Sequence, residues 1–411
     1  MKHAVVVPIL KKGGSDANAL TNYRPISNIT FVAKTTERFV AQQVQHFMEE
    51  NGIYGIYQSA YRAHHSAETA LVRIHNDIAH SIDNRQSVLL VLLDLSAAFD
   101  TIDHTILLRR LSGYGLSGDV LAWLTSYLCD RTYVVRVKSG VSESDIITTG
   151  VPQGTVLGPL LFNAYIAPLT TLLQKHNIRH HLYADDTQLY ITFPPTDHTQ
   201  ALAPRRNFPR YTGSRINANL TMTSQVANVC RSAYYHLSRI AKIRDSISTT
   251  VCKSLIHGLV ASRLDYGNAI LHGISDRHMH RLEMVQRSAA RIVRQIRRGD
   301  RQSMTTILRQ LHWLPVRKRI DFKLLVLVHR AIYNGTPEYL AALLRRHTPP
   351  RSLRSAGGLL LEVPRVNLER FGRRAFACAG PTLWNKLPRN IRENSNITQF
   401  KKQLKTLLFS T

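Results

Sequence analysis

The stretch His181-Leu-Tyr-Ala-Asp-Asp-Thr-Gln-Leu-Tyr-Ile191 has the pattern of a β-hairpin, and it bears most directly on the fold class. Two β-favouring runs flank the polar pair Asp185-Asp186, which would form the tight turn between them. Upstream, Ser87-Val-Leu-Leu-Val-Leu-Leu93 is a short continuous apolar run, typical of a strand buried on both faces, and it ends at Asp94. If these strands are neighbours in one sheet, Asp94 and Asp185 lie side by side.

Carboxylates placed in this way have the chemistry of a two-metal site. Hard divalent cations prefer oxygen ligands, and two carboxylates can bridge ions roughly 3.5–4 Å apart that activate an attacking hydroxyl and stabilise a leaving group. Each feature also has an ordinary explanation. An Asp after a strand often caps a helix or turn, and an Asp-Asp pair is often only a solvated turn. The spacing by itself leaves both interpretations open.

Helices are expected around these strands. The segment after Asp94 predicts a turn leading into a helix that carries Ile102, Ile106 and Leu107, and residues 118–128 predict a second amphipathic helix. Residues 133–137 are expected to form a strand. The uncharged stretch 146–174 is long enough for a membrane helix, but its repeated Gly and Pro residues favour a buried loop followed by a core helix.

The composition is that of a globular protein. A length of 411 residues allows two or three domains, with 44% hydrophobic and 20% charged residues. The four cysteines are scattered without paired metal spacing, which indicates neither a disulfide framework nor a zinc site and fits a reducing compartment. The apolar run at the N-terminus is too short for a secretory signal, so we expect an intracellular protein of the nucleus or cytoplasm.

The positive charge is confined to the second half of the chain. Residues 1–200 hold 16 Lys and Arg against 17 Asp and Glu, a net charge of −1, whereas residues 201–411 hold 38 against 10, a net charge of +28. Such an excess repels itself unless an anion binds it, and nucleic acid is the commonest such partner. A solvated basic surface and a membrane-surface patch are the alternatives.

Five blocks resemble the ordered motifs of reverse transcriptases from non-LTR (LINE-type, jockey-like) retrotransposons. They occur in the family's order at compatible separations, which makes the resemblance far more specific than any single motif. The blocks are Asn22-Tyr-Arg-Pro-Ile-Ser27, Gln58-Ser-Ala-Tyr-Arg62 continuing to His65-Ser-Ala-Glu68, Leu93-Asp-Leu-Ser-Ala-Ala-Phe-Asp100, Gly150-Val-Pro-Gln-Gly154 with Leu157-Gly-Pro159, and Tyr183-Ala-Asp-Asp186.

The resemblance implies an α+β right-hand polymerase fold. This fold has fingers, a palm built on an antiparallel sheet flanked by helices, and a helical thumb followed by a basic C-terminal region. By the motifs, partial fingers span 1–66, the palm 67–197, a helical thumb-like region 219–345 and the basic C-terminal region 346–411. Residues 198–218 are expected to be an irregular junction between palm and thumb.

The resemblance also implies the roles of the acidic residues. Asp94 and Asp185 resemble the metal-binding aspartates, Asp186 is the second member of the pair, and the main-chain carbonyl of Leu95 is an extra metal ligand. The ions implied are two Mg²⁺ or Mn²⁺. Phe99 resembles the bulky residue that leaves no room for a 2′-hydroxyl; otherwise it is an ordinary core aromatic.

Further residues would hold the nucleotide and the primer. Arg62 resembles the fingers residue that grips the incoming triphosphate, a task suited to its bidentate guanidinium, and its ordinary alternative is a surface arginine. Gln153 with Gly150 and Gly154 resembles the loop that lines the nucleotide and template pocket, although the glycines could equally only shape a turn. Tyr183 would lie by the primer end, or be a plain hairpin tyrosine.

The sequence departs from the family in two places. The chain opens inside what would be the fingers, with no endonuclease before it, so we do not expect it to nick target DNA. Between Phe193 and Asn219, several dozen residues of the family palm are absent, including the hairpin that grips the primer. The remaining Pro-, Gly- and Arg-rich stretch indicates a linker, and loss of primer positioning would lower the polymerisation rate.

The second half is predicted to be mostly helical and to resemble the jockey-like region after the thumb. Asp276 is expected to cap a helix whose apolar face includes Leu282, Val285, Ala289, Ile292 and Ile296. A stripe on another face of this helix would follow a phosphate backbone, or be merely solvated; it is formed by Arg287, Arg291, Arg294 and Arg298. Trp313 and Trp384 lie among apolar neighbours and are expected to be core anchors rather than base-stacking platforms.

Two functions follow from these patterns. The first is RNA-directed DNA polymerisation, with an RNA template, a DNA primer and deoxynucleoside triphosphates as partners, alongside element RNA or other element-encoded proteins. The second is a catalytically impaired retrotransposon remnant that only binds nucleic acid through its basic helical half. A third possibility is that the chain does not fold stably, in which case proteases would cleave it early near residues 198–218.

Overall fold

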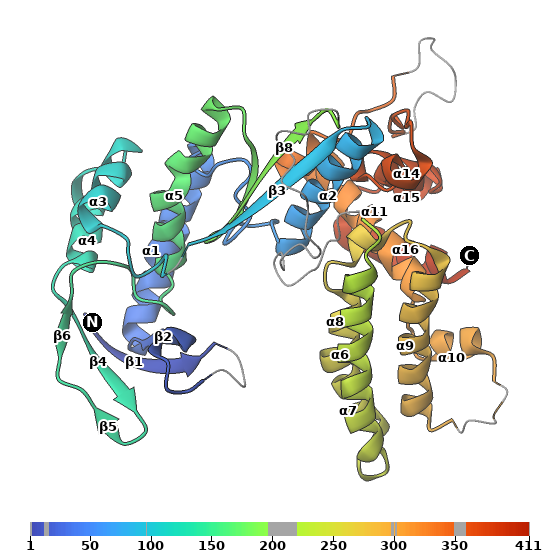
Figure 1. Ribbon diagram of the computed structural model, residues 1–411, viewed down its shortest axis with the longest axis horizontal. Helices are drawn as coiled ribbons and strands as arrows, with labels where there is room; N and C mark the ends of the chain where they lie inside the picture. The colour runs from blue at the N-terminus through green and yellow to red at the C-terminus, as the bar shows by residue number, and fades with distance from the viewer. Residues whose placement is uncertain are drawn as a thin grey trace. The chain divides into compact units, whose positions relative to one another are not determined.

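The computed structural model describes residues 2–11, 16–95, 97–195, 220–296, 300, 302–348 and 359–410. The predicted junction over 198–218 and the side chain of Arg298 lie outside these residues. The described part of the chain separates into two compact units. The first unit is Met1–Tyr61 with Leu93–Leu189, and the second is Arg62–Leu92 with Tyr190–Thr411 (Figure 1).

The described residues of the first unit contain a mixed sheet that joins the N-terminal strands β1 and β2 to strands from residues 131–147. Strand β1 pairs antiparallel with β2 and parallel with β4, and β4 pairs antiparallel with β5 and β6. The motif that begins at Asn22 supplies β2, in a register that places Leu10 opposite Tyr23. The strands are β1 (His3–Leu10), β2 (Tyr23–Asn28), β4 (Arg131–Val137), β5 (Gly140–Val141) and β6 (Asp145–Ile147).

Helices of the first unit enclose an apolar core. Thr30 and Asp103 cap two of them by accepting backbone N–H bonds from Ala33 and Ile106. The core includes the fully buried Leu107, Leu111, Leu124, Leu161 and Phe162. The helices are α1 (Phe31–Glu50), α3 (His104–Gly113), α4 (Gly118–Leu128) and α5 (Gly158–Lys175), preceded by a 3₁₀ turn η1 (Leu20–Asn22).

These helices confirm the sequence predictions. The predicted helix over 118–128 has the bounds of α4, and the helix after Asp94 is α3. The uncharged stretch forms a largely buried loop at 150–157 followed by the core helix α5. Among the described residues, no helix has the length and apolarity that a membrane span requires.

A second sheet carries the acidic residues. Within the described residues it has the order β3-β8-β7, with β3 (Ser87–Asp94), β7 (Arg179–Tyr183) and β8 (Asp186–Phe193). The predicted strand and hairpin are therefore confirmed, and β3 and β8 are neighbours as the argument from the sequence required.

Two details of this sheet differ from the prediction. Strand β3 is not buried on both faces, since Val91 and Leu93 are 39% and 45% exposed. In the described part of the chain, β3 lies at an edge of the sheet, so its apolar run is only partly covered. The two-residue turn is Ala184-Asp185 rather than Asp185-Asp186, because Ala184 adopts a left-handed φ of 56° and Asp186 already belongs to β8.

The second unit is helical outside its strands. Helix α2 is buried along most of its length and begins with a capping box between Ser66 and Thr69. Figure 1 shows α6 and α9 as long neighbouring helices, which contact each other. The helices are α2 (Ala67–Asp83), α6 (Thr223–Lys242), α7 (Thr249–Ile256), α8 (Ser262–Asp265), α9 (Asp276–Arg294), α10 (Met304–Gln310), α11 (Val316–Asn334), α12 (Glu338–Ala341), α13 (Glu369–Gly372), α14 (Phe376–Asn385), α15 (Arg389–Arg392) and α16 (Ile397–Ser410), with short turns η2 (Arg244–Ser246), η3 (His257–Ala261) and η4 (Asn268–Leu271).

Buried polar groups tie α2 to the C-terminal helices. The Asp83 carboxylate is 2% exposed and accepts backbone N–H bonds from Asn367 and Leu368, the latter at 2.6 Å. The Asn76 side chain accepts a bond from the backbone N–H of Ala377. A buried carboxylate is stable only when its oxygens are hydrogen-bonded, so these contacts fix the end of α2 against the chain near α13.

The predicted tryptophan anchors are confirmed. Trp313 is 5% exposed and Trp384 is fully buried. The Trp384 indole N–H donates a 2.7 Å bond to the carbonyl of Leu359, and its ring lies 5.8 Å from that of Phe400. Burying the aromatic body and satisfying the N–H together make Trp384 a core residue of the second unit.

We predict that Trp384→Ala lowers the free energy of unfolding of the second unit by about 3–5 kcal/mol, because it leaves a large cavity. Urea denaturation followed by far-UV circular dichroism measures the loss. Tyr234→Ala is the control, since Tyr234 is 42% exposed and its truncation should cost no more than about 0.5 kcal/mol. Equal losses in the two variants would contradict the assignment of Trp384 to the core.

Candidate active site

The second sheet brings the three predicted aspartates to one end of neighbouring strands. Asp94 is the last residue of β3, Asp186 is the first residue of β8, and Asp185 lies in the turn that precedes β8. Asp185 and Asp186 are half-buried, and Asp94 is exposed. Leu95 follows β3 directly and is 41% exposed.

The proximity of these carboxylates appears in their electrostatics. Burial raises the pKa of Asp186, and the negative charges of Asp185 and Asp94 raise it further. Burial likewise raises the pKa of the Tyr61 hydroxyl, with a further contribution from Asp185. The end of this sheet is therefore a region of concentrated negative potential that a bound cation would relieve.

The carboxylates do not form a ready-made metal cage. Among the residues described by the structure, no group of three or more His, Cys, Asp or Glu side chains is arranged to hold a metal ion. What the sheet provides is carboxylate oxygens at one end of adjacent strands: Asp94 ends β3, Asp185 lies in the turn before β8, and Asp186 begins β8.

The motif that begins at Gln58 fixes the hairpin that carries Asp185. The Gln58 side chain, 3% exposed, accepts hydrogen bonds from the backbone N–H groups of Ala60 and Ala184. The backbone of Leu182 pairs with Tyr57 and Ser59 on either side of this glutamine. Gln58 thus holds the turn residue next to Asp185. The motif drew attention to this segment, but the sequence assigned Gln58 no role.

The predicted nucleotide loop is tied to the segment that follows Asp94. The Gln153 amide donates to both carboxylate oxygens of Asp100, at 3.1 and 3.0 Å. Two backbone bonds join the same segments, from Gly150 to the carbonyl of Ile102 and from Val151 to that of Phe99. Burial raises the pKa of Asp100, and the hydrogen bond from Gln153 opposes this shift. Asp100 ends the Asp94 motif, but nothing in the motif indicated this contact with Gln153.

Both glycines of this loop are required by its geometry. Gly150 has a φ of +81°, and a Cβ placed there would lie 2.7 Å from the Cα and carbonyl oxygen of Asp100. Gly154 has a φ of +98°, and a Cβ there would meet the carbonyl oxygen of Ser27 at 3.2 Å. The glycines therefore permit close packing of the loop on two other motif segments.

Phe99 is half-buried and packs against the core of the first unit. Its ring stacks on that of Phe162, with centroids 4.7 Å apart and an angle of 26° between the planes. A ring held by a stacked partner has a fixed orientation. This packing fits the core interpretation and is equally compatible with the predicted steric role.

A buried carboxylate supports the loop from α1, and sequence analysis missed it. Glu37 is 2% exposed, accepts a hydrogen bond from the Tyr127 hydroxyl, and accepts the backbone N–H groups of Val156 and Leu157. These N–H groups precede α5, where a negative charge interacts favourably with the helix dipole. No helix is predicted over Phe31–Glu50, and Glu37 by itself gives no sign of its burial.

The structure gives the location and burial of two other predicted site residues, Tyr183 and Arg62, but does not test their roles. Tyr183 is the last residue of β7 and is half-buried. Arg62 is the first residue of the second unit and is also half-buried. Their roles with primer and triphosphate stay predictions.

Three of the four predicted stripe arginines lie on α9. Arg287 and Arg294 are exposed and Arg291 is half-buried, while Arg298 lies outside the described residues. Arg294 bonds to the side chain of Gln310. The opposite face buries Leu282, Val285 and Ala289 as predicted, whereas Ile292 and Ile296 are only half-buried.

The predicted cap of this helix is wrong by one residue. Ser275 occupies the N-cap position, and Asp276 is the first residue of α9. The Asp276 carboxylate instead forms an ion pair with Arg317 at 2.8 Å.

We predict that Gly150→Ala destabilises the first unit by about 2–5 kcal/mol, because it combines a left-handed backbone with a clash against Asp100. Gly52→Ala is the matched control: Gly52 has a φ of +60° with nothing within 4 Å of the added Cβ, so only about 1–2 kcal/mol should be lost. Urea denaturation compares them. Equal costs would show that the loop does not pack closely on Asp100.

We also predict that Asp186→Asn resists denaturation better than the wild type at pH 7 in the absence of divalent cations. The pKa of Asp186 is raised in the folded state, so its ionisation destabilises the fold as pH rises above the ordinary value of 3.8. The difference between the two proteins should close as the pH falls toward 3.8. A difference that does not depend on pH would contradict the electrostatic cause.

Comparisons with known proteins agree with the motifs. Residues 9–227, more than half of the chain, match the family model described as reverse transcriptase (RNA-dependent DNA polymerase). The chain is 25% identical over 425 residues to the probable RNA-directed DNA polymerase from transposon X-element of Drosophila melanogaster, covering 89% of this chain and 45% of the relative. It is 32% identical over 161 residues to that from transposon BS of the same organism, covering 39% of this chain and 18% of the relative.

A third relative is the RNA-directed DNA polymerase from mobile element jockey of Drosophila melanogaster. It is 27% identical over 191 residues, covering 45% of this chain and 21% of the relative. The chain therefore spans less than half the length of these relatives. Among solved structures, apo telomerase from Candida tropicalis matches with a TM-score of 0.43 and 11% identity, covering 83% of this chain and 67% of that one.

These findings confirm the predicted resemblance and the α+β class. The family match includes all five motif blocks and the aspartates at the end of the second sheet. Helices and two sheets make up the described fold, which is therefore of the α+β class. The chain therefore belongs to the reverse transcriptase family, and its relatives include the RNA-directed DNA polymerases of transposon X-element and mobile element jockey.

Proposed function

We propose that this chain is the RNA-directed DNA polymerase region of a non-LTR retrotransposon protein, which joins a deoxynucleoside triphosphate to the 3′-hydroxyl of a primer. The observation that supports this most is the meeting of Asp94 with Asp185 and Asp186 at one end of adjacent strands. Its partners are an RNA template, a DNA primer and deoxynucleoside triphosphates, with element RNA and other element-encoded proteins as further partners.

The residues present fit a divalent cation. The donors are oxygens, as Mg²⁺ and Mn²⁺ prefer, and burial together with the charges of Asp185 and Asp94 raises the pKa of Asp186. Asp94, Asp185 and the Leu95 carbonyl would hold two such ions, with Asp186 beside them. Bound there, the ions would lower the pKa of the primer hydroxyl and stabilise the leaving pyrophosphate.

The surrounding residues would position the substrates. Gln153 and Gly154 would line the nucleotide pocket, and Phe99, fixed by Phe162, would exclude a 2′-hydroxyl. Arg62 would bind the triphosphate through its guanidinium, and Tyr183 would contact the primer end. Correct placement of the reacting groups contributes as much to such reactions as the ions do.

We infer the division of the chain from the motifs. Fingers would occupy 1–66, the palm 67–197 and the thumb-like region 219–345, with the basic region at 346–411. We propose that the protein acts inside the cell, in the nucleus or cytoplasm. All four of its cysteines, each within the described residues, are free thiols, which suits a reducing compartment.

The alternative function is nucleic-acid binding by a catalytically impaired remnant. The net charge of +28 over 201–411 motivates it, together with the short connection between Phe193 and Asn219. The family match and the relatives do not favour this alternative. In both functions, the arginines of α9 would contact phosphates, so binding alone does not separate them.

We predict that purified protein extends a DNA primer on an RNA template in the presence of Mg²⁺ or Mn²⁺. Asp94→Asn and Asp185→Asn should each reduce extension by at least about 100-fold, because each removes a charged metal ligand. Gel analysis of extended primers measures this. The control is Asp119→Asn, an acidic residue in the first turn of α4, outside the site.

A second readout tests the site without turnover. Mg²⁺ should raise the thermal midpoint of the wild type and of Asp119→Asn, but not that of Asp94→Asn, because only a bound ion stabilises the folded state. Extension that is equal in the wild type and Asp94→Asn, or absent from both, would refute the polymerase function.

A further inference from the structure

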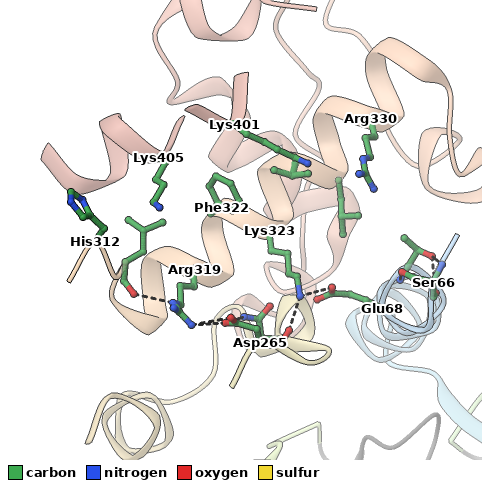
Figure 2. Close-up of a pocket in the computed structure, with 15 residues that line it drawn as sticks. Ser66, Glu68, Asp265, His312, Arg319, Phe322, Lys323, Arg330, Lys401 and Lys405 are labelled. Atoms are coloured by element: carbon green, nitrogen blue, oxygen red, sulfur yellow. Dashed lines mark hydrogen bonds and ion pairs between the residues drawn. The ribbon is translucent and has the colours of Figure 1, made fainter. Parts of the chain in front are cut away.

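The second unit contains a basic cavity of about 490 Å³ that the proposed polymerase chemistry does not use. It lies along α11 and α16 and is bounded by the start of α2 and by the chain around Asp265. Five of its lining residues are Arg or Lys and two are Asp or Glu, which gives its wall a formal charge of +3. Figure 2 shows how these side chains face one another.

One side of the cavity is a structural ion-pair network. Arg319 donates to both carboxylate oxygens of Asp265, at 3.0 and 2.9 Å. Lys323 reaches the Glu68 carboxylate at 2.7 Å and the carbonyl of Asp265 at 2.6 Å. Glu68 also accepts the backbone N–H of Ala269. These contacts join α2, α8 and α11, so both cations are already neutralised.

The other side carries cations without such partners. Among the described residues, no ion pair joins Arg330, Lys401 or Lys405 to a carboxylate, and Figure 2 draws no bond from any of them. Their positive charge acts on the buried His329. Burial lowers the pKa of this histidine, and the charges of Arg330 and Lys401 lower it further. Lys401 and Lys405 are four residues apart, so they share one face of α16.

Apolar groups lie among these cations. In Figure 2 the Phe322 ring lies between the two lysines of α16 and the ion pairs below. Phe322 is half-buried, so part of its ring is accessible. A second depression continues along α16 and shares His312 with the first; Arg309, Thr406, Phe409 and Ser410 line the rest of it. We call the two depressions together the α11–α16 groove.

We propose that the α11–α16 groove binds single-stranded nucleic acid. Its cations would contact successive phosphates, and Phe322 would offer a ring face to a base. The Phe409 ring already has the Lys405 ammonium 6.0 Å from its centroid, so it would hold that cation beside the strand. A positively charged groove that holds accessible aromatic rings is the arrangement that binds single strands without sequence preference. The three unneutralised cations in the first depression match a polyanion better than a single small anion.

This site is separate from the arginine stripe of α9. The stripe is a convex helix face, whereas the groove is a concave surface between α11 and α16. This inference rests on the proposed function in one respect: the proposed function is the reason for choosing nucleic acid as the polyanion that the groove binds. Binding can be measured without metal ions or deoxynucleoside triphosphates, so a failure of polymerisation and a failure of groove binding give different results.

The test compares two double variants with the same loss of charge. Lys401→Gln/Lys405→Gln removes two groove lysines, and Lys386→Gln/Lys402→Gln removes two exposed lysines that do not line it. Lys402 is a close control: it lies on α16 and lines a neighbouring depression that shares Thr406 and Ser410 with the groove but contains none of the groove's cations or phenylalanines. The probes are fluorescein-labelled 15-nucleotide oligouridylate and oligothymidylate, titrated by fluorescence anisotropy at several salt concentrations.

The groove variant should bind both probes roughly 10- to 30-fold more weakly at 0.1 M salt than the control variant. Its plot of log affinity against log salt should be shallower by about 1.4, corresponding to two lost phosphate contacts. Phe322→Leu should weaken binding by about tenfold without changing that slope, because it removes stacking but no charge. Thermal unfolding of each variant establishes that the fold is intact.

Two results would overturn the proposal. The first is equal affinity and equal salt slope for the groove and control double variants. The second is full displacement of the oligouridylate by polyglutamate of equal charge, with Phe322→Leu binding as the wild type does. That result would mark the groove as a general anionic-peptide surface rather than a nucleic-acid site.

Discussion

The structure around the candidate active site must hold three negatively charged side chains close together. Three carboxylates meet at the end of the second sheet, where burial and mutual repulsion raise the pKa of Asp186. Such an arrangement is unfavourable by itself, so the surrounding structure must stabilise it. Gln58 fixes the hairpin turn, and the bond from Gln153 to Asp100 fastens the loop after Asp94. The polar contacts around the site thus maintain a geometry that a divalent cation would relax.

The motif blocks are distant in sequence but joined by main-chain contacts. The glycine loop packs on the segment after Asp94 and, through Gly154, against Ser27 in β2. Glu37 of α1 holds the end of the same loop. Gln58 holds Ala184, so each of the five blocks contacts another block or the aspartates within the first unit. The residues of each block are therefore needed for packing, in addition to any part they have in catalysis.

The basic residues of the second unit have two different uses. Arg319 and Lys323 are paired with the half-buried carboxylates of Asp265 and Glu68 and hold helices together. Arg330, Lys401 and Lys405 have no ion pair among the described residues, which leaves their charge available to a ligand. Net charge read from a sequence does not separate these uses, because pairing depends on which helices pack side by side.

The hairpin, the strand that ends at Asp94, helices α3, α4 and α5, and the family were all predictable from the amino-acid sequence, because strand and helix periodicities and ordered motifs are local signals. The position of β3 at a sheet edge, the Ala184-Asp185 turn and the burial of Glu37 became evident only in the folded chain. Burial and hydrogen-bond partners arise from contacts between distant segments, and no local pattern encodes them.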